Sequence, residues 1–304
     1  GFSYPSFAKK GKKLFYQQRH EKSSIASLDL SSDIASSPFP VVVSDFSHHS
    51  PDYNSQRQRV AYVSNETGFY ELWSASTKGE ERKQLTRLKK NISYPKWSHD
   101  GSQIAFLASA ENNKHDSIYI YSLLTQQVSM VPSPFYRHNR PNWCLDDKHI
   151  ISAIYGDEFT DVFKITIDDG SVERLTFDNA RYGIMNSATT LLYTKTKRGL
   201  WQMDLTDKSK APIKIIGGAD FTSLYAWDYH DDSIYFIKQL SDHHKVMQLE
   251  MKHKKTNALF KLPLKSFYHR DIINYIPDND ALIYTQSSFP KANIKMLENS
   301  SVFE

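Results

Sequence analysis

Histidine, arginine and tyrosine side chains recur in this sequence just before short apolar segments that repeat along the chain. If those segments are the innermost strands of one closed ring, the loops that enter them converge on one mouth of a central channel. Guanidinium and imidazole groups beside aromatic rings could hold an anionic ligand or a peptide there, and the histidines could sense pH. Alternatively, these side chains only line a wet channel mouth. The candidate residues are Tyr4, His48, His49, Tyr94, Arg137, His138, Arg181, Tyr182, Asp220, His269 and Arg270.

The sequence contains no pattern typical of covalent catalysis or metal binding. A serine nucleophile on a strand-to-helix elbow requires G-x-S-x-G, which does not occur. Acidic clusters such as Asp168-Asp169-Gly170 fall at expected hairpin turns and lack the calcium-loop spacing that ends in Glu. Carboxylates at such positions favour turn stabilisation. We therefore expect a non-catalytic protein with no catalytic residues, no metal and no cofactor.

The segments that would position the candidate residues form seven repeats, spaced by 42 to 48 residues. In the clearest copy, Pro95-x-Trp97 is followed by a turn at Asp100-Gly101, an apolar strand at 104–106 and an alternating strand at 118–121. Most copies close on a more polar fourth strand. Four short strands per repeat are typical of a β-propeller, whereas a parallel β-helix needs a shorter period. The anchors are Pro5-x-Phe7, Pro51-x-Tyr53, Pro95-x-Trp97, Pro141-x-Trp143, Gly183-x-Met185, Tyr225-x-Trp227 and Ile273-x-Tyr275.

These repeats predict an all-β fold with a single propeller domain over residues 1–304, most simply of seven blades, each a four-stranded antiparallel sheet. Six blades with an irregular closure are the alternative. Only six copies contain a fourth strand, so either the closing strand precedes Gly1 or the seventh blade has three strands. The predicted blades span residues 1–46, 47–91, 92–137, 138–180, 181–221, 222–268 and 269–304.

Composition narrows the partners of the 304-residue chain. Its 38 basic and 34 acidic residues give a net charge of +4, and the basic residues form short scattered clusters, so we expect no direct nucleic-acid contact. Cys144 is the single cysteine, which excludes an intrachain disulfide and is neutral on compartment. No apolar run reaches the length of a membrane span. The chain opens without Met, so we expect it to be part of a longer protein.

The repeat resembles the TolB-type "WD40-like" (PD40) repeat, which reads approximately W-S-P-D-G-x-x-I-A-F. The residues that carry the resemblance are Trp97 to Phe106 and the repeat-closing pairs Leu85-Thr86 and Leu175-Thr176. His99 stands where the pattern has Pro, and residues 55–58 replace the Asp-Gly turn of their copy. These departures affect turns and leave the strand pattern intact.

Three segments in order, residues 14–28, 62–73 and 293–299, also resemble the C-terminal part of ToxR/CadC-like membrane-bound transcriptional regulators. This resemblance implies a periplasmic sensor propeller that signals to transcription. A winged-helix DNA-binding domain and a membrane anchor would then lie in an N-terminal part outside this sequence. From the loop residues we expect a protein or small ligand at the channel mouth, and a dimer of the full-length protein stays open. The alternatives are a TolB-like periplasmic scaffold that binds another envelope protein, an accessory propeller of a peptidase-type enzyme, and a cytoplasmic or soluble periplasmic location.

Overall fold

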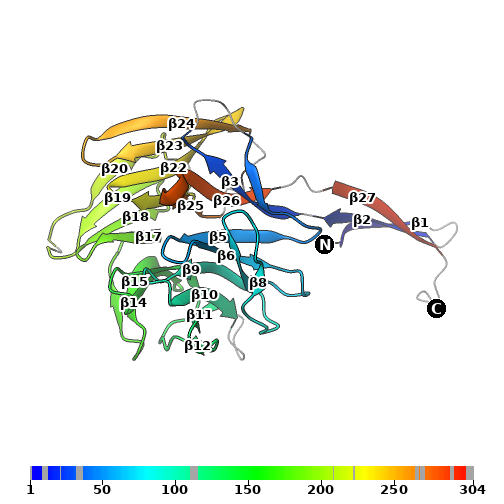
Figure 1. Cartoon of the computed structure of the whole chain (residues 1–304), viewed down its shortest axis with the longest axis horizontal. Helices are drawn as coiled ribbons and strands as arrows, with labels where there is room; N and C mark the ends of the chain where they lie inside the picture. The colour runs from blue at the N-terminus through cyan, green and yellow to red at the C-terminus, as the bar shows by residue number, and fades with distance from the viewer. Residues whose placement is uncertain are drawn as a thin grey trace.

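The computed structural model is built almost entirely of short antiparallel strands that form six four-stranded sheets and one three-stranded sheet in the described chain. The six larger sheets are arranged as the blades of a propeller, with the first strand of each nearest the centre (Figure 1). Within the described part of the chain, no helix is long and apolar enough to cross a membrane. The structure describes residues 2–8, 13–20, 22–31, 37–109, 116–207, 209–221, 223–263, 267, 271–287 and 291–298.

Five blades are each formed by four consecutive strands. Blade 1 comprises β5 (His48–Asn54), β6 (Arg59–Ser64), β7 (Glu71–Ser76) and β8 (Lys83–Gln84). Blade 2 comprises β9 (Ile92–Trp97), β10 (Gln103–Ser109), β11 (Asp116–Ser122) and β12 (Val128–Met130). Blade 3 comprises β13 (His138–Trp143), β14 (His149–Tyr155), β15 (Thr160–Thr166) and β16 (Val172–Arg174). Blade 4 comprises β17 (Ala180–Ser187), β18 (Thr190–Lys195), β19 (Gly199–Asp204) and β20 (Ile213–Gly217). Blade 5 comprises β21 (Trp227–His230), β22 (Ser233–Gln239), β23 (His243–Glu250) and β24 (Lys255–Pro263).

Blade 6 closes the ring with strands from both ends of the chain. Its order is β25 (Ile273–Ile276), β26 (Ala281–Ser287), β3 (Ser23–Asp29) and β4 (Phe39–Val42). The early strand β3 pairs with the late strand β26 along its whole length, from Ser23 opposite Ser287 to Asp29 opposite Ala281 (Figure 1). This pairing leaves no open edge in the ring.

The prediction of seven blades was therefore wrong, and its alternative of six blades is what the structure shows. The first repeat contributes its third and fourth strands to blade 6, and the last repeat contributes its first and second. Counting repeats overestimated the blades because one blade draws on two incomplete copies. The segments 1–46 and 269–304 are accordingly not separate blades.

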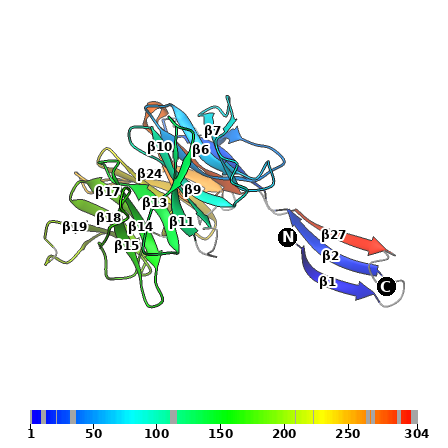
Figure 2. The same ribbon diagram turned by 90° about the horizontal axis from the view of Figure 1, so that it is seen from below.

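The strands left over from both repeats form a three-stranded sheet of order β1 (Phe2–Ala8), β2 (Lys13–His20) and β27 (Lys291–Glu298). Here β2 and β27 pair antiparallel, from Lys13 opposite Glu298 to His20 opposite Lys291. The sheet stands to one side of the propeller (Figure 2). The anchor that the sequence analysis placed at Pro5 thus lies outside the ring.

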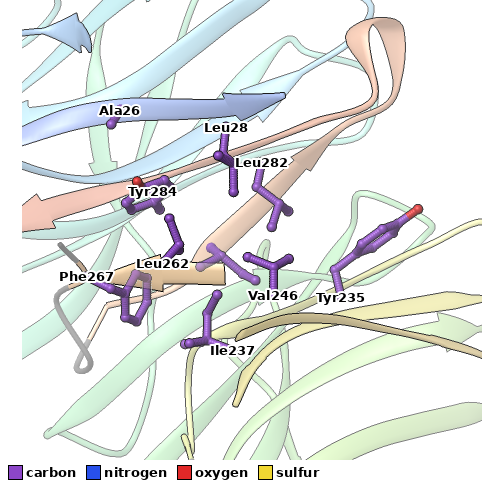
Figure 3. Packing of buried hydrophobic residues seen from close by; sticks show 11 residues of the cluster. Ala26, Leu28, Tyr235, Ile237, Val246, Leu262, Phe267, Leu282 and Tyr284 are labelled. Carbon is purple, nitrogen blue, oxygen red and sulfur yellow. The ribbon is translucent and has the colours of Figure 1, made fainter. Parts of the chain in front are cut away.

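The ring is held by apolar clusters between neighbouring blades. In the cluster of Figure 3, Ile237 and Val246 of blade 5 pack with Leu28, Leu282 and Tyr284 of blade 6. All five side chains are at most 4% exposed. Burying such a side chain contributes about 1.5–3 kcal/mol, so closure depends on packing as well as on strand pairing. The middle strands therefore read as continuous apolar runs, because both of their faces are covered.

The repeat-closing Leu-Thr pairs have a structural reason. In blade 3, the Thr176 hydroxyl donates to the carboxylate of Asp161 at 2.9 Å and accepts from the Val162 amide at 2.9 Å. Thr86 bonds to Glu71 and Leu72 of blade 1 in the same way. The threonine therefore ties the end of the outermost strand to the third strand.

Candidate functional site: the central channel

Each blade contributes the middle of its innermost strand to the wall of a central channel. One residue of each strand lines the cavity at this level, and five of these six channel positions are polar or charged. The five polar side chains are at most 9% exposed. Together with tyrosine rings at the strand ends, they surround a cavity of about 250 Å³. The six positions are Asp52, Lys96, Asn142, Ile184, Asp228 and Asn274.

Most of these polar side chains tie one blade to the next. The Asp228 Oδ2 of blade 5 accepts hydrogen bonds from the Tyr275 amide at 2.8 Å and the Asn274 Nδ2 at 3.1 Å, both in blade 6. Asn274 in turn accepts from the Tyr53 amide of blade 1 at 2.8 Å. Because the bonds run to the neighbouring backbone, they stabilise the ring and leave its axis open.

Asp52 and Lys96 form a buried ion pair between blades 1 and 2. The Lys96 Nζ lies 2.6 Å from the Asp52 Oδ1, and the Trp97 amide donates to the Asp52 Oδ2 at 2.7 Å. Burial lowers the pKa of Lys96, but the carboxylates of Asp52 and Asp228 more than offset this and raise it above its usual value. Burial raises the pKa of Asp52, although Lys96 lowers it. We assign both members of the pair as charged because the Lys96 ammonium and the Trp97 amide each donate to one oxygen of Asp52.

One end of the channel is filled by Arg140. Its guanidinium carbon lies 3.4 Å from the ring centroid of Tyr225 and 4.3 Å from that of Tyr94. It also donates to the Tyr94 hydroxyl at 3.0 Å and to the Asn139 Oδ1 at 2.8 Å. Tyr94 belongs to blade 2 and Tyr225 precedes blade 5, which lie opposite each other in a six-bladed ring. A side chain that contacts both must cross the channel.

Local backbone geometry points Arg140 inward. Arg140 precedes Pro141 and has a φ of +47°, at a register irregularity of β13 between Asn139 and Asn142. Such a bulge re-aims side chains on an otherwise regular strand. Tyr94 also precedes a proline and has a φ of +51°. The residue that precedes the proline of the repeat, Tyr94 in blade 2 and Arg140 in blade 3, therefore lines this end of the channel.

Tyr182 lies between the Arg140 stack and the polar ring. Its ring packs edge-on against Tyr225 at a centroid distance of 6.4 Å, and its hydroxyl lies 3.4 Å from the Asn142 Nδ2. Burial raises the pKa of Tyr182 to about 12, while Lys96 lowers it. The phenol therefore stays neutral beside the polar ring.

The opposite end of the channel is framed by the turns between first and second strands. The Asn54 Nδ2 of blade 1 donates to the Ser98 carbonyl of blade 2 at 3.0 Å. The His99 amide of blade 2 donates to Asp147 of blade 3 at 2.9 Å, and the His99 Nδ1 lies 2.8 Å from the same oxygen. A proline at position 99, as the general repeat has it, could not donate this amide bond. The departure from the repeat pattern thus links two blades.

The family model of the TolB β-propeller domain (PD40) matches residues 55–301. This chain belongs to the TolB β-propeller family. A TolB candidate from Agrobacterium tumefaciens aligns with a TM-score of 0.70 at 15% identity, over 89% of this chain and 99% of that one. TolB from Acinetobacter baumannii aligns with a TM-score of 0.61 at 14% identity, over 85% and 78%. These likenesses confirm the predicted PD40 resemblance and the fold.

Some other structures with a similar propeller are larger enzymes. A puromycin hydrolase aligns with a TM-score of 0.58 at 11% identity, over 84% of this chain but only 44% of that one. At this identity the likeness concerns the fold alone. The narrower resemblance to membrane-bound regulators stays a prediction.

The TolB-type ring brings three of the predicted mouth residues together, namely Tyr94, Arg181 and Tyr182. The Arg181 guanidinium stacks on the Tyr155 ring at 5.2 Å, and Tyr155 is hydrogen-bonded to the Tyr225 that contacts Arg140. These groups form one continuous aromatic and cationic cluster at the closed end.

The predicted histidines at this end are packed away from the channel. The His48 Nε2 bonds to the Ser44 hydroxyl at 2.8 Å, and burial lowers the pKa of His48 to about 4 although Glu66 raises it. The His138 Nε2 contacts the Phe135 carbonyl at 3.0 Å, and burial likewise lowers its pKa to about 4. Both imidazoles are therefore neutral at physiological pH and do not titrate near pH 7.

The remaining predicted residues lie apart from the cluster or outside the described side chains. His49 packs against the Tyr70 ring at 4.7 Å, and burial lowers its pKa. The exposed Arg137 lies 3.9 Å from Asp157, and Asp220 pairs with Lys238. Outside the described side chains are Tyr4, in β1 beyond the ring, and His269 and Arg270.

Ser44 and His48 resemble a nucleophile and its base but lack the geometry of a triad. Glu66 lies 3.7 Å from the same Nε2 that contacts Ser44, and the buried Nδ1 has no partner within the described structure. A triad needs an acid on the second nitrogen to orient the ring. Among the described residues, no group of three or more His, Cys, Asp or Glu side chains could hold a metal ion.

The sequence analysis missed the polar ring and Arg140. The ring has a readable signal, since a polar residue stands at the x of Pro-x-aromatic in three consecutive repeats, at Asp52, Lys96 and Asn142. A polar residue between two core residues of an innermost strand is expected near the channel, because that strand lies closest to the axis. Arg140 stands directly before the proline in the same motif, and only the bulge reveals its direction.

Proposed function

We propose that this propeller is a non-catalytic protein-binding domain of the TolB type, which holds a segment of another envelope protein in its channel pocket. The observation that carries the proposal is the blind pocket. Arg140 fills one end of the channel between Tyr94 and Tyr225, and the cavity lies toward the other end, where turn residues such as Ser55 and His99 line it. A cavity of about 250 Å³ fits one or two side chains of a partner. Proteins of this kind would act in the periplasm.

The pocket favours a basic side chain. Asp52 and Asp228 face a single ammonium group, Lys96, which leaves one net negative charge. Each oxygen of Asp52 already accepts a hydrogen bond, whereas Asp228 uses only its Oδ2 in hydrogen bonds to described residues. Its Oδ1 can therefore accept from an incoming lysine or arginine.

Site-specific photocrosslinking in the full-length protein tests this function. A photoreactive residue in place of His230, on the pocket rim, is expected to crosslink one envelope protein, and Asp228→Asn in the same chain should lower the yield several-fold. The control position is Lys252, exposed on an outer turn of blade 5 on the same face. Equal adducts at both positions, or a yield unaffected by Asp228→Asn, would refute channel binding.

A second candidate is the sensor domain of a membrane-bound transcriptional regulator. The observation in its favour is that two of the three segments with this resemblance, 14–28 and 293–299, meet where β2 pairs with β27 outside the ring. Propeller closure does not require that sheet, so it is free to serve another role. The coding sequence upstream of Gly1 distinguishes the two candidates. A winged helix followed by a membrane span supports the regulator, and a cleavable signal peptide supports the scaffold.

A further inference from the structure

A groove lies on the turn face of the propeller between blades 1 and 2, away from the channel axis. Its volume is about 630 Å³. Leu85, Trp97, Tyr121 and Leu123 form an apolar floor, and Arg57 and Lys83 stand on its rim. We propose that this groove is a docking site for an extended acidic segment of a partner protein with one apolar anchor side chain. The proposal is independent of the channel function, because the groove opens between blades.

The groove exists because one turn does not pack against the preceding blade. In blades 1 and 3 the turn before the outermost strand carries Gly79 and Gly170, and a Cβ at either would overlap the Val41 or Pro132 carbonyl of the blade before. In blade 2 the corresponding position is Gln126, with a φ of +57°. A side chain at that position excludes the close approach that glycine permits, so the space between the blades stays open.

The floor of the groove offers hydrogen-bond donors without acceptors. Trp97 is 5% exposed, and its buried Nε1 has no partner within the described residues. The equivalent Trp143 of blade 3 donates its Nε1 to the Lys96 carbonyl at 2.8 Å. The Tyr121 hydroxyl lies in the same floor and is a second donor. A buried donor left unsatisfied costs about 1–3 kcal/mol, so a backbone or carboxylate oxygen from a bound segment would be favoured here.

The charge on the rim selects an acidic segment. Arg59 is neutralised by Glu81, with its Nη1 2.9 Å from the Glu81 Oε2. Arg57 and Lys83 form no ion pair with any described residue, so the lining has an excess of two positive charges. The neighbouring Leu124 is 90% exposed and extends the apolar surface. Complementary charge would steer and orient the segment, and the apolar floor would take its anchor.

The corresponding groove between blades 3 and 4 provides an internal comparison. It measures about 300 Å³, and its four charged residues, Arg174, Asp178, Asp204 and Lys210, sum to zero. It therefore has an apolar lining without the positive excess. Acidic segments should bind only between blades 1 and 2.

Fluorescence anisotropy with labelled peptides tests the proposal. The probes are roughly nine residues long, enough to span about 30 Å when extended, with a central Leu or Phe flanked by Asp and Glu, and a matched set flanked by Lys. We expect the acidic set to bind at least tenfold more tightly, and Arg57→Glu with Lys83→Glu to weaken it about tenfold. The matched control is Lys252→Glu with Lys254→Glu, two exposed residues on a blade 5 turn.

Each outcome of this experiment bears on the proposal. Equal binding of both peptide sets, or equal losses in the two charge-reversal variants, would overturn it. Binding that changes in Asp228→Asn, in either direction, but not in the Arg57→Glu and Lys83→Glu variant would assign the acidic peptide to the channel and reject the groove. Far-ultraviolet circular dichroism of each variant shows whether the propeller remains folded. Should the double variant unfold, Leu123→Asp would repeat the test on the floor of the groove.

Discussion

The two ends of the central channel are formed by the same six inner strands but by different chemistry. At the strand starts, Arg140 is stacked between Tyr94 and Tyr225, so that the side chains satisfy one another across the axis. Toward the other end, in the polar ring, Asp228 and Asn274 bond to the backbone of the next blade. Side chains that contact each other across the axis fill the channel, whereas side chains that bond to the neighbouring blade leave the axis free. The open end is therefore the one that can receive a partner.

The largest stability effect is expected from breaking the ion pair at the open end. Asp52→Ala leaves the Lys96 ammonium, which is 9% exposed, without its carboxylate. Removing one partner of a buried pair costs about 3–5 kcal/mol, because the other charge stays buried. Urea unfolding followed by tryptophan fluorescence measures this loss.

The double variant Asp52→Ala with Lys96→Met is the control for this prediction. It removes the stranded charge and should recover part of the stability lost in the single variant. A single variant as stable as the parent, or a double variant that is less stable than the single one, would show that the pair is not the link between blades 1 and 2.

The closed end should make the protein acid-sensitive. The pKa of His48 and of His138 is lowered from 6.5 to about 4 by burial, so between these values the unfolded chain binds more protons than the folded one. Stability is therefore fully present above pH 6.5 and falls as the pH drops toward 4, by at most about 3 kcal/mol for each histidine. Urea midpoints at pH 7.5, 6.5, 5.5 and 4.5 measure this slope.

Substituting one buried histidine separates its contribution from that of other acid-sensitive groups. His138→Gln should be less stable at pH 7.5 but should show a shallower loss below pH 6.5. An unchanged slope would contradict the assignment to His138. The same experiment tests a histidine switch near pH 7, which the loop positions of these residues suggested. Their burial disfavours such a switch, so we expect little change in stability between pH 7.5 and 6.5.

Repeats and strand order could be predicted from sequence because they depend on local patterns. The run at 104–106 and the turn at Gly101 specify a strand and a hairpin wherever they occur. The number of blades could not be predicted in this way, because ring closure depends on β3 pairing with β26, which lies almost the whole chain away in sequence. No local feature distinguishes a complete repeat from two halves that share one blade.

The candidate site shows the same limit at the level of side chains. Position in an entry loop placed His48 and Arg181 near one end of the channel, but it does not reveal which way a side chain points. The His48 side chain points back to Ser44 in the loop before its strand, whereas the Arg140 side chain crosses the channel axis from a bulge in β13. A polar residue at the same position of consecutive repeats is the more reliable guide, and it would have identified Asp52 and Lys96.

Opening the closed end should cost less than breaking the ion pair. Arg140→Met removes two cation–π contacts and should lower stability by about 1–2 kcal/mol, while the thioether still fills part of the space. The matched control is Arg137→Met in the preceding loop, whose exposed guanidinium lies 3.9 Å from Asp157 and should change stability by less than about 0.5 kcal/mol. Equal losses in both variants, measured by urea unfolding, would mean that Arg140 does not act as the plug.

The smallest effect on stability is expected from Asp228→Asn at the open end. An amide oxygen can still accept from the Tyr275 amide, so the variant should lose less than about 1 kcal/mol. It nevertheless removes the net negative charge of the pocket, since Lys96 and Asp52 then balance each other. A variant that unfolds like the parent in urea but no longer crosslinks its partner would separate the two roles of the ring. A variant that loses several kcal/mol of stability and also loses the crosslink would show that Asp228 is a structural residue. The charge-based selectivity proposed for the pocket would then have no support.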